Sequence, residues 1–404
     1  MAKRRIDQID VSGRRVLMRV DFNVPIKDGK ITDDRRIRMA LPSIESVLKR
    51  KGRLVLLSHL GRPEGTGYEP ADSLEPCARR LTEVLGASCR GAVRFPSHDC
   101  VDGAATAAVN LLADGECALL ENVRFHKGEK KGDPAFAAKL AAHGDIYCND
   151  AFGTCHRPDA SMVAVPRAMA NKPKVCGFLV EREIRYLSEA LEAPARPFAV
   201  VLGGAKVSDK LPAIAHLLPK ADHILIGGAM AYTFLKARGI GTGNSRVEAD
   251  RVEDARRILE QGGRGSCRIH LPSDHLVARE FSEHAPAQTV KGEIPEGLMG
   301  LDIGPATRES FAQTLLGART IVWNGPMGVF EWTNFAPGTK RIGEAIAEAT
   351  TRGAISIVGG GDTAAAAEQL GFAPAMSHVS TGGGASLEML EGKAFESVEL
   401  LDSA

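Results

Sequence analysis

The chain has 404 residues, a length that predicts two or three domains at roughly 150 residues each. Its 51 Lys and Arg balance 50 Asp and Glu, which argues against a surface that is basic throughout and binds polyanions. Hydrophobic residues at 44% and charged residues at 25% are ordinary globular values and exclude a disordered chain. Glycine is the outlier: its 43 copies among 404 residues are a larger share than the average of about 7%, and no Gly-X-Y period accounts for them.

The first residues and the cysteines indicate the compartment. The start of the chain is charged without an apolar stretch behind it, so we expect no secretory signal. The longest uncharged apolar stretches, such as 224–235, fall short of the roughly 18 residues of a membrane span, so we expect no membrane partner. Eight cysteines without a Cys-x-x-Cys pair fit neither a zinc pattern nor a disulfide framework. We therefore expect a cytoplasmic protein.

Short β-branched and Leu-rich runs alternate with longer amphipathic stretches along the chain, which is typical of an α/β fold with mostly parallel sheets. The predicted strands are 16–20, 54–57, 118–120 and 146–148, then 198–202, 224–226, 320–323 and 355–358. Helices are predicted between them, for example over 42–51, 134–142, 250–261 and 338–350.

A domain boundary is predicted near residues 180–197. Apolar residues at 180, 184, 187 and 191 place one face of a helix over 180–191. Pro194 and Pro197 then end it before the next strand. The simplest interpretation is a helix that connects two α/β domains.

Ligands of open parallel sheets bind beyond the carboxyl ends of the strands, so the residues there predict the site. In the first half these positions carry anion-binding side chains and a local charge excess: residues 1–62 hold 16 basic and 7 acidic residues. The segments are Asp21-Phe-Asn23, Ser58-His-Leu-Gly-Arg62, Glu121-Asn-Val-Arg124 and Asn149 to Arg157, with Arg36 after the first loop. This pattern favours a site for a small anion.

In the second half the strand ends carry glycine, and 28 of the 43 glycines follow residue 194. The segments are Gly203-Gly-Ala-Lys206, Gly227-Gly-Ala-Met230, Asn324-Gly-Pro326 and Gly359-Gly-Gly-Asp-Thr363. Glycine lets backbone N–H groups approach a phosphate, and a helix N-terminus favours its charge. Asp362 or Thr363 is a candidate cap for the following helix, and Asp362 is equally a candidate Mg²⁺ ligand.

Each of these features alone has a structural explanation. A Gly-Gly turn can serve tight packing, a single arginine can form a salt bridge, and His59 can be a structural residue of the core. Only their coincidence at eight strand ends favours two ligand sites. The motifs of P-loop NTPases, dinucleotide-binding folds, protein kinases, serine hydrolases and zinc proteases are missing. A nucleic-acid binder is disfavoured too, because aromatic residues do not interleave with the basic ones.

In order along nearly the whole chain, eight segments resemble the phosphoglycerate kinase family. They are Arg19-Val-Asp-Phe-Asn-Val-Pro25, Ser58-His-Leu-Gly-Arg-Pro63, Leu120-Glu-Asn-Val-Arg-Phe125, Asp150-Ala-Phe-Gly-Thr154 with His156-Arg157, Gly203-Gly-Ala-Lys-Val-Ser-Asp-Lys210, Val322 to Glu331, Gly359 to Thr363, and Ser380 to Ala385. Two departures stand out: Cys155, where Ala is commoner, and the residues after Lys393, which replace a usual Gly/Pro ending.

The resemblance implies a monomer of two doubly wound parallel-sheet domains joined by a hinge helix. The domains would be 1–179 for the glycerate substrate and 198–379 for the nucleotide, joined by 180–197, with 380–404 returning to the first domain. The implied reaction is reversible transfer of a phosphoryl group from 1,3-bisphosphoglycerate to ADP, giving 3-phosphoglycerate and ATP, with Mg²⁺ bound to the nucleotide.

The resemblance also assigns the site residues. The glycerate contacts would be Asp21, Asn23, Arg36, His59, Arg62, Arg124 and Arg157. The nucleotide contacts would be Gly203, Gly204, Lys206, Lys210, Gly227, Gly228, Asn324, Pro326, Glu331, Gly360, Gly361, Asp362 and Thr363, with Asp362 as the metal ligand. Because the acceptor carboxylate, with a pKa near 4, is ionised at pH 7, no general base is needed. Arg36 and Lys206 are therefore the expected catalytic residues, stabilising charge on the transferred group.

Two other functions stay open on the sequence alone. One is a different acyl-phosphate or carboxylate kinase, against which the number of arginines in the first half argues. The other is a non-catalytic sensor of phosphorylated metabolites, which would not need Lys206, Lys210 and Asp362 to be intact.

Overall fold

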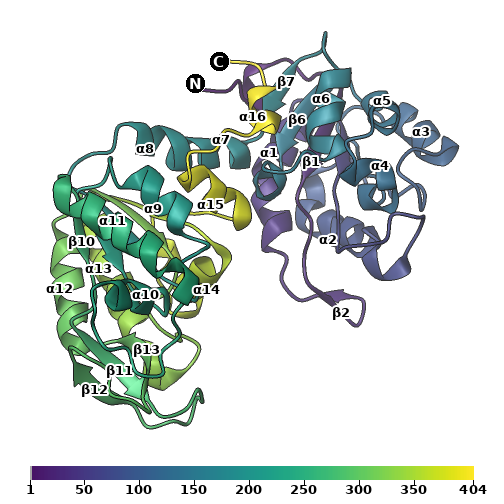
Figure 1. Ribbon diagram of the computed structural model, residues 1–404. Helices are drawn as coiled ribbons and strands as arrows, with labels where there is room; N and C mark the ends of the chain where they lie inside the picture. Colours follow the sequence, from purple (N-terminus) through teal and green to yellow (C-terminus); the bar gives the residue numbers. More distant parts are fainter. Residues whose placement is uncertain (1) are drawn as a thin grey trace. The chain divides into compact units, whose positions relative to one another are not determined.

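The computed structural model describes residues 2–404, and the chain forms two compact units (Figure 1). Unit 1 comprises Met1–Arg185 and Ala394–Ala404, and unit 2 comprises Tyr186–Lys393. Each unit is built on its own parallel sheet.

The sheet of unit 1 has five parallel strands in the order β5-β4-β1-β6-β7. Their bounds are β1 (Arg15–Val20), β4 (Arg53–Leu57), β5 (Cys117–Leu119), β6 (Ile146–Asp150) and β7 (Lys174–Cys176). All five residues of β6 and all but the first of β1 and β4 are buried, as expected of a sheet covered on both faces. The strand order reverses between β1 and β6, and this reversal is where parallel sheets bind ligands.

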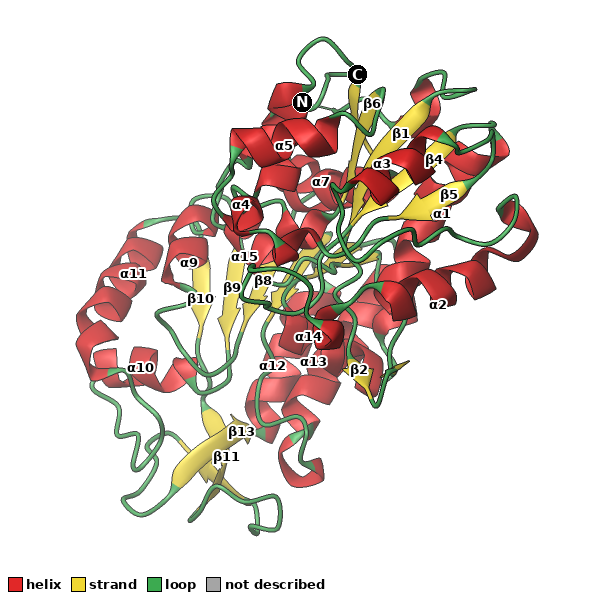
Figure 2. Cartoon of the chain, turned by 90° about the vertical axis from the view of Figure 1, so that its right-hand side faces the viewer, coloured by secondary structure: helices red, strands yellow, loops and turns green. Residues whose placement is uncertain are grey.

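The helices of unit 1 pack around this sheet (Figure 2). They are α1 (Arg35–Lys49), α2 (Glu75–Leu85), α3 (Gly103–Asn110), α4 (Lys127–Lys130), α5 (Pro134–Ala141), α6 (Val165–Ala168), α7 (Phe178–Ile184) and α16 (Glu396–Glu399). Apolar residues of α1 and α2, such as Ile44 and Leu81, share one core with Val16 and Met18 of β1. A short hairpin, β2 (Ile26–Lys27) and β3 (Lys30–Ile31), precedes α1.

Unit 2 has a six-stranded parallel sheet in the order β10-β9-β8-β14-β15-β16. The bounds are β8 (Phe198–Leu202), β9 (His223–Ile226), β10 (Arg268–His270), β14 (Thr320–Asn324), β15 (Ile355–Val358) and β16 (His378–Val379). Here the order reverses between β8 and β14, so the ends of these two strands mark the expected ligand position of this unit.

Helices and a small second sheet complete unit 2. The helices are α8 (Ala190–Glu192), α9 (Leu211–Leu217), α10 (Met230–Ala237), α11 (Val252–Arg264), α12 (Pro305–Leu316), α13 (Pro337–Thr351), α14 (Gly361–Gln369) and α15 (Gly384–Leu390). Apolar residues of α12 and α13, such as Phe311 and Ile346, share a core with Val201 and Trp323 of the sheet. The second sheet is antiparallel and consists of β12 (Gln288–Lys291), β11 (Asp274–Ala278) and β13 (Met299–Ile303).

All eight predicted strands are present within one or two residues of their predicted ends, and the α/β fold class is confirmed. The predicted helix over 42–51 begins earlier, at Arg35, because Pro42 lies inside α1 and does not mark its start. The antiparallel sheet, the hairpin and the short edge strands β7, β10 and β16 were not predicted.

The segment between the units is helical, as the periodicity predicts. It consists of α7, a π-helical stretch (Arg185–Glu189) and α8, and the division between the units falls after Arg185. The four apolar residues at 180, 184, 187 and 191 are all buried.

The C-terminal segment begins later than residue 380. The structure assigns residues up to Lys393 to unit 2, because α15 packs against α9 and the N–H of Ser380 donates to Val358 O (2.8 Å). Only Ala394–Ala404 lies in unit 1, where the N–H of Asp402 donates to Lys174 O (2.8 Å).

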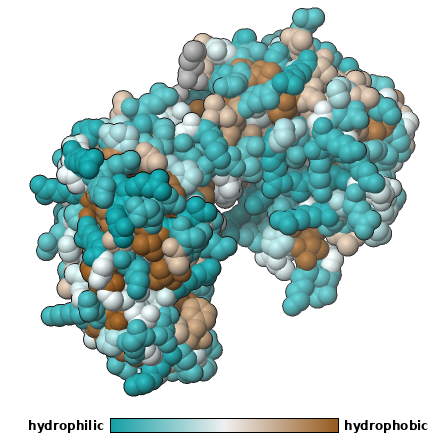
Figure 3. Space-filling view, in the orientation of Figure 1, coloured by the Kyte–Doolittle hydropathy of each residue, from teal (hydrophilic) through white to brown (hydrophobic). Residues whose placement is uncertain are grey.

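Hydrophilic residues cover most of the face of each unit that is visible in Figure 3, with apolar side chains in separate patches. Among residues 2–404, no helix combines the length and the apolar character that a membrane crossing requires.

Candidate functional site

The candidate site of unit 1 lies at the carboxyl ends of its strands, and we call it the basic site. Its predicted members follow β1, β4, β5 and β6 or begin α1. They are Asp21, Asn23, Arg36, His59, Arg62, Arg124 and Arg157.

Asp21 and Arg36 form an ion pair in the basic site, with Arg36 Nη1 2.6 Å from Asp21 Oδ2. The side chain of Arg36 is 39% exposed, so it can contact a ligand as well. Burial raises the pKa of Asp21, but the side chains of His59, Arg36 and Arg19 outweigh that effect, and the pKa lies below its ordinary value. Asp21 is therefore ionised at neutral pH and fixes the position of Arg36.

His59 is buried and neutral. Burial lowers its pKa well below the ordinary value, and the charges of Arg19, Arg124 and Arg157 lower it further. Arg19 Nη2 lies 3.1 Å from His59 Nδ1, and because a guanidinium only donates, Nδ1 must be the acceptor. The proton of His59 is therefore on Nε2, which makes Nε2 a hydrogen-bond donor for a ligand.

Arg124 and Arg157 act on the same histidine and on each other, which shows that the structure brings them together. Arg124 is buried; its Nη1 donates to Gly61 O (2.8 Å), whereas Asp159 Oδ2 lies 3.8 Å from its Nη2. Burial, then the charge of Arg157, lowers the pKa of Arg124. Arg124 Nε has no hydrogen-bond partner among the described residues, so a buried donor is left for an anion.

The remaining two predicted residues lie on or against the loop after β4. Asn23 Oδ1 accepts from the N–H of Gly61 (2.9 Å), so this side chain holds the loop in place. Arg62 is exposed on the same loop.

Two buried residues that were not predicted support the side chains of the basic site. Arg19 is fully buried in β1, and its Nε donates to Ser161 Oγ (2.8 Å). Glu129, also fully buried, accepts from the N–H of Ser161 (2.9 Å), and burial raises the pKa of its carboxyl. The signal for Arg19 was present in the sequence, as the one charge inside an apolar strand run; Glu129 carried none.

The candidate site of unit 2 lies at the ends of β8, β9, β14 and β15, and we call it the glycine-rich site. At the reversal of strand order its backbone segments touch: the N–H of Gly203 donates to Asn324 O (3.1 Å) and that of Gly204 to Pro326 O (3.0 Å). A Cβ on Gly203 would overlap with Pro326 O, and one on Gly325 would overlap with Gly203 O. These two glycines are required by backbone packing.

Other glycines of this site are open. A Cβ on Gly204 or Gly361 would meet no atom within 4 Å, so the space beside both residues is open to a ligand, although the N–H of Gly204 is already engaged by Pro326 O. Gly361 begins α14, whose N-cap residue is Gly360 (φ +89°) without a side-chain cap. The prediction that Asp362 or Thr363 caps this helix is therefore wrong.

Thr363 and Asp362 have different surroundings. Thr363 is buried and its hydroxyl accepts from the N–H of Gly325 (2.7 Å), which joins the end of β14 to α14. Asp362 is exposed in the first turn of α14, and its charge acts on Lys210. An exposed carboxylate at this place fits a Mg²⁺ ion that keeps most of its water.

The two predicted lysines also differ. Lys206 is exposed and forms no ion pair among residues 2–404. Lys210 donates from Nζ to Asn324 Oδ1, and burial lowers its pKa. Asn324 is fully buried, and its Nδ2 has no partner within the described part of the chain. This N–H₂ group is a buried donor that a phosphate oxygen would satisfy.

Gly227, Gly228 and Glu331 complete the predicted set. The N–H of Gly228 (φ +65°) donates to Met327 O (2.9 Å), and the N–H of Gly227 donates to Leu202 O (2.8 Å), so both groups are engaged in the fold. Glu331 is exposed.

Asp302 of β13 supports the loop that leads from β14 to α13, and it was not predicted. Its Oδ2 accepts from the N–H of Gly338 (2.6 Å), and a Cβ on Gly328 or Gly338 would overlap with its carboxylate. Burial raises its pKa to about 7. No spacing in the sequence links Asp302 to a loop 26 residues further along.

Fold and sites together define a class of protein. Two α/β units with parallel sheets, one with a basic site suited to a small anion and one with open glycines and lysines at strand ends, are typical of a phosphotransferase, which moves a phosphoryl group between a polyphosphate and a metabolite.

Comparison with known proteins gives the family. The family model described as phosphoglycerate kinase matches residues 6–393. A phosphoglycerate kinase of Rhodopirellula baltica is 55% identical over the full length of both chains, and one of Chlorobium limicola is 48% identical, also over both full lengths. A solved phosphoglycerate kinase structure from Coxiella burnetii has a TM-score of 0.90 at 39% identity, and one from Pyrococcus horikoshii has 0.82 at 33%, each covering 98% of both chains. The chain belongs to the phosphoglycerate kinase family and is a kinase.

Proposed function

We propose that this enzyme carries out the reaction of its family with the glycerate substrate on the basic site and the nucleotide on the glycine-rich site. The reaction is the reversible transfer of a phosphoryl group from 1,3-bisphosphoglycerate to ADP, giving 3-phosphoglycerate and ATP in glycolysis and gluconeogenesis. The observation that carries the assignment of the basic site is the neutral, buried His59 surrounded by the charges of Arg19, Arg124 and Arg157.

In the basic site we assign the phosphate and carboxylate of the substrate to positive and N–H donors. The unpartnered Nε of Arg124 and the Nε2–H of His59 supply two such donors. Arg62 and Arg157 add charge, and Asp21 and Asn23 bind hydroxyl groups or hold Arg36 and the Gly61 loop in place. Several cations suit a substrate that carries a phosphoryl group as well as a carboxylate, whereas a simple carboxylate would not need them.

In the glycine-rich site we assign the nucleotide phosphates to the backbone N–H of Gly361 and the open space beside Gly204, to Asn324 Nδ2 and to the two lysines. Asp362 would hold Mg²⁺, which when bound neutralises charge on the phosphates. Glu331 is assigned to the ribose, by resemblance to the family.

Transfer itself requires charge stabilisation and alignment, without a general base. The carboxylate that accepts the phosphoryl group from ATP is already ionised at neutral pH. Arg36 and Lys206 stabilise the charge of the transferred group, in line between the two substrates. Because the substrates are bound by different units, we propose that a hinge movement about residues 180–197 brings them together before transfer.

The same proposal places the enzyme in the cytoplasm as a monomer. The eight cysteines are all buried and free, which suits a reducing compartment.

The test is formation of ATP from MgADP and 1,3-bisphosphoglycerate by the purified protein and by Arg36→Ala and Lys206→Ala. Losing one preorganised charge contact costs on the order of 10² to 10³ in turnover. We expect reductions of this size in kcat for both variants, with unchanged circular dichroism.

A matched control is Arg35→Ala, at the neighbouring exposed arginine of α1 that pairs with Asp33 (2.8 Å). Its turnover should stay within about twofold of the unmodified enzyme, a change below 0.5 kcal/mol. Equal losses in Arg35→Ala and Arg36→Ala would refute the role of Arg36, and absence of ATP formation by the folded enzyme would refute the proposed function.

A further inference from the structure

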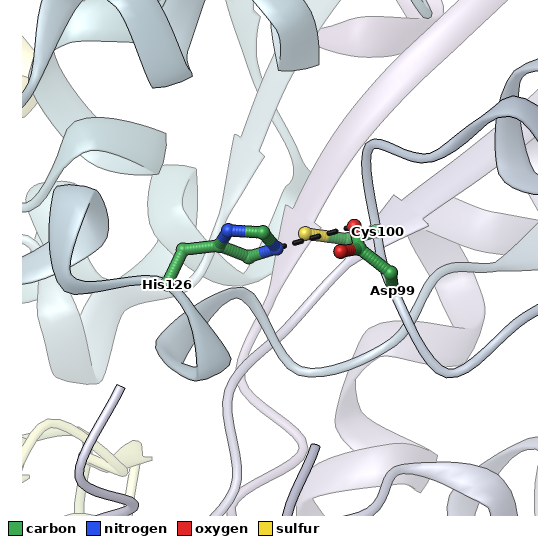
Figure 4. A group of neighbouring side chains, drawn as sticks. All are labelled: Asp99, Cys100 and His126. Carbon is green, nitrogen blue, oxygen red and sulfur yellow. Dashed lines mark hydrogen bonds and ion pairs between the residues drawn. The ribbon is translucent and has the colours of Figure 1, made fainter. Parts of the chain in front are cut away.

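A cluster of side chains of the types that bind metals lies in unit 1 and includes none of the basic-site residues. Asp99 and Cys100 belong to the loop before α3, and His126 lies between a short 3-10 helix (Val123–Phe125) and α4. Figure 4 shows the imidazole of His126 pointing toward the other two side chains. A carboxylate oxygen, the thiol sulfur and an imidazole nitrogen lie within 4.8 Å of one another.

From this convergence we propose that Asp99, Cys100 and His126 bind a zinc ion, with a water molecule as fourth ligand. One thiol, one imidazole and one carboxylate form a donor set that suits zinc and is too soft for Mg²⁺. On binding, the thiol of Cys100 loses its proton to solvent and its sulfur bonds to the metal.

A hydrogen bond between His126 Nε2 and Asp99 Oδ1 (3.2 Å) accounts for two of the three groups without a metal. It does not account for the third. Cys100 is 1% exposed, and in the described part of the chain its thiol has no hydrogen bond to another residue.

Neighbouring groups fix the positions of the three proposed ligands, as the surrounding hydrogen bonds do in known metal sites. The N–H of Val101 donates to Asp99 Oδ1 (2.7 Å), and His143 Nε2 donates to the carbonyl oxygen of Cys100 (3.2 Å). The ring of His126 stacks on Phe136, with 4.7 Å between ring centroids.

An ion can reach the cluster from solvent. The side chains of Asp99 and His126 are 41% and 28% exposed, so two ligands face water and the buried sulfur lies behind them. The loop around the two outer ligands therefore need not unfold for zinc to enter.

The test is titration of the metal-free enzyme with Zn²⁺ against a chromophoric chelator, and with Co²⁺ followed by its absorption. We expect one Zn²⁺ per chain with micromolar or tighter affinity, and a sulfur-to-cobalt charge-transfer band in the near ultraviolet. Cys100→Ser should abolish the band and weaken Zn²⁺ at least tenfold.

His126→Gln and Asp99→Asn, at partly exposed positions, should weaken Zn²⁺ similarly even if Cys100→Ser fails to fold. The control is Cys267→Ser, at a buried cysteine three residues before His270, whose Nε2 lies 3.1 Å from His223 Nδ1. It should bind metal as the unmodified enzyme does. No binding at 100 µM Zn²⁺, or equal binding by His126→Gln, or loss in Cys267→Ser, would overturn the proposal.

Discussion

Single charged residues in this enzyme take their protonation state from burial and from one or two neighbours. His59 stays neutral because it is buried among arginines, and Asp21 stays ionised because its neighbours outweigh its burial. Asp302 is the opposite case: it is buried with one weak cationic contact, Arg308 Nη2 at 3.4 Å, and its pKa rises to about 7.

Asp302 therefore gives the stability of unit 2 a pH dependence whose sign is fixed. Its pKa of about 7 in the fold exceeds its ordinary value of 3.8, so the folded state binds the proton more tightly. The folded state is then favoured at pH 4, and this contribution is lost as pH rises from about 4 to about 7. A shift of this size corresponds to a free energy on the order of 4 kcal/mol at most.

We predict that Asp302→Asn flattens the fall of the thermal midpoint between pH 4 and pH 7. Asn keeps an oxygen to accept from Gly338, so the loop contact survives. The comparison is Asp102→Asn, at the N-cap of α3, where backbone and Ser97 hydrogen bonds outweigh burial and lower the pKa of the carboxyl. The contribution of the ionised Asp102 to the stability of the unmodified enzyme should instead be lost as pH falls. Identical pH profiles for Asp302→Asn and the unmodified enzyme would contradict the account.

At the scale of elements, the strand ends divide the glycines into two groups. Gly203 and Gly325 allow β8 and β14 to approach at the backbone, whereas Gly204 and Gly361 are open. The sequence does not separate these groups, because both appear as Gly-Gly or Gly-Pro after a strand. The difference depends on which strands become neighbours.

We predict that Gly203→Ala lowers the stability of the enzyme, whereas Gly361→Ala weakens the binding of MgADP. The methyl group at 203 overpacks the backbone, which typically costs about 1 to 3 kcal/mol, so the thermal midpoint should fall by several degrees. The methyl group at 361 meets no protein atom, so the midpoint should hold while the Kd for MgADP rises about tenfold, or 1.4 kcal/mol. Calorimetry on both variants would measure the thermal midpoint and the Kd for MgADP. A loss of stability in both variants with unchanged ADP binding would refute the division of the glycines into two groups.

At the scale of the whole molecule, the sequence was sufficient to predict the alternation of strands and helices and the positions at which the strands end. Eight strands were predicted because each is a nearly continuous apolar run, as buried parallel strands require. The antiparallel sheet was missed because β11 begins with Asp274 and His275, which are buried yet polar. Short edge strands such as β16, with two residues, give too little pattern to detect.

The C-terminal segment shows a second limit of the sequence. Its last eleven residues return to unit 1, where Ser397 Oγ donates to Cys155 O (2.7 Å) and the ring of Phe395 lies 6.4 Å from that of Phe152. By resemblance to the family, Cys155 and the residues after Lys393 are the two places expected to depart from its usual pattern. That they meet through a backbone carbonyl depends on long-range packing and not on any local motif.

The central claim is that each unit binds one substrate, and paired titrations test it most directly. Isothermal titration calorimetry would measure 3-phosphoglycerate and MgADP binding to the unmodified enzyme, to Arg157→Ala and to Lys206→Ala. We predict that Arg157→Ala weakens 3-phosphoglycerate about tenfold or more and leaves MgADP within twofold, and that Lys206→Ala does the reverse, since one charged contact contributes about 1.5 to 3 kcal/mol. Weakening of the same ligand in both variants, or of MgADP in Arg157→Ala alone, would contradict the assignment of the two sites.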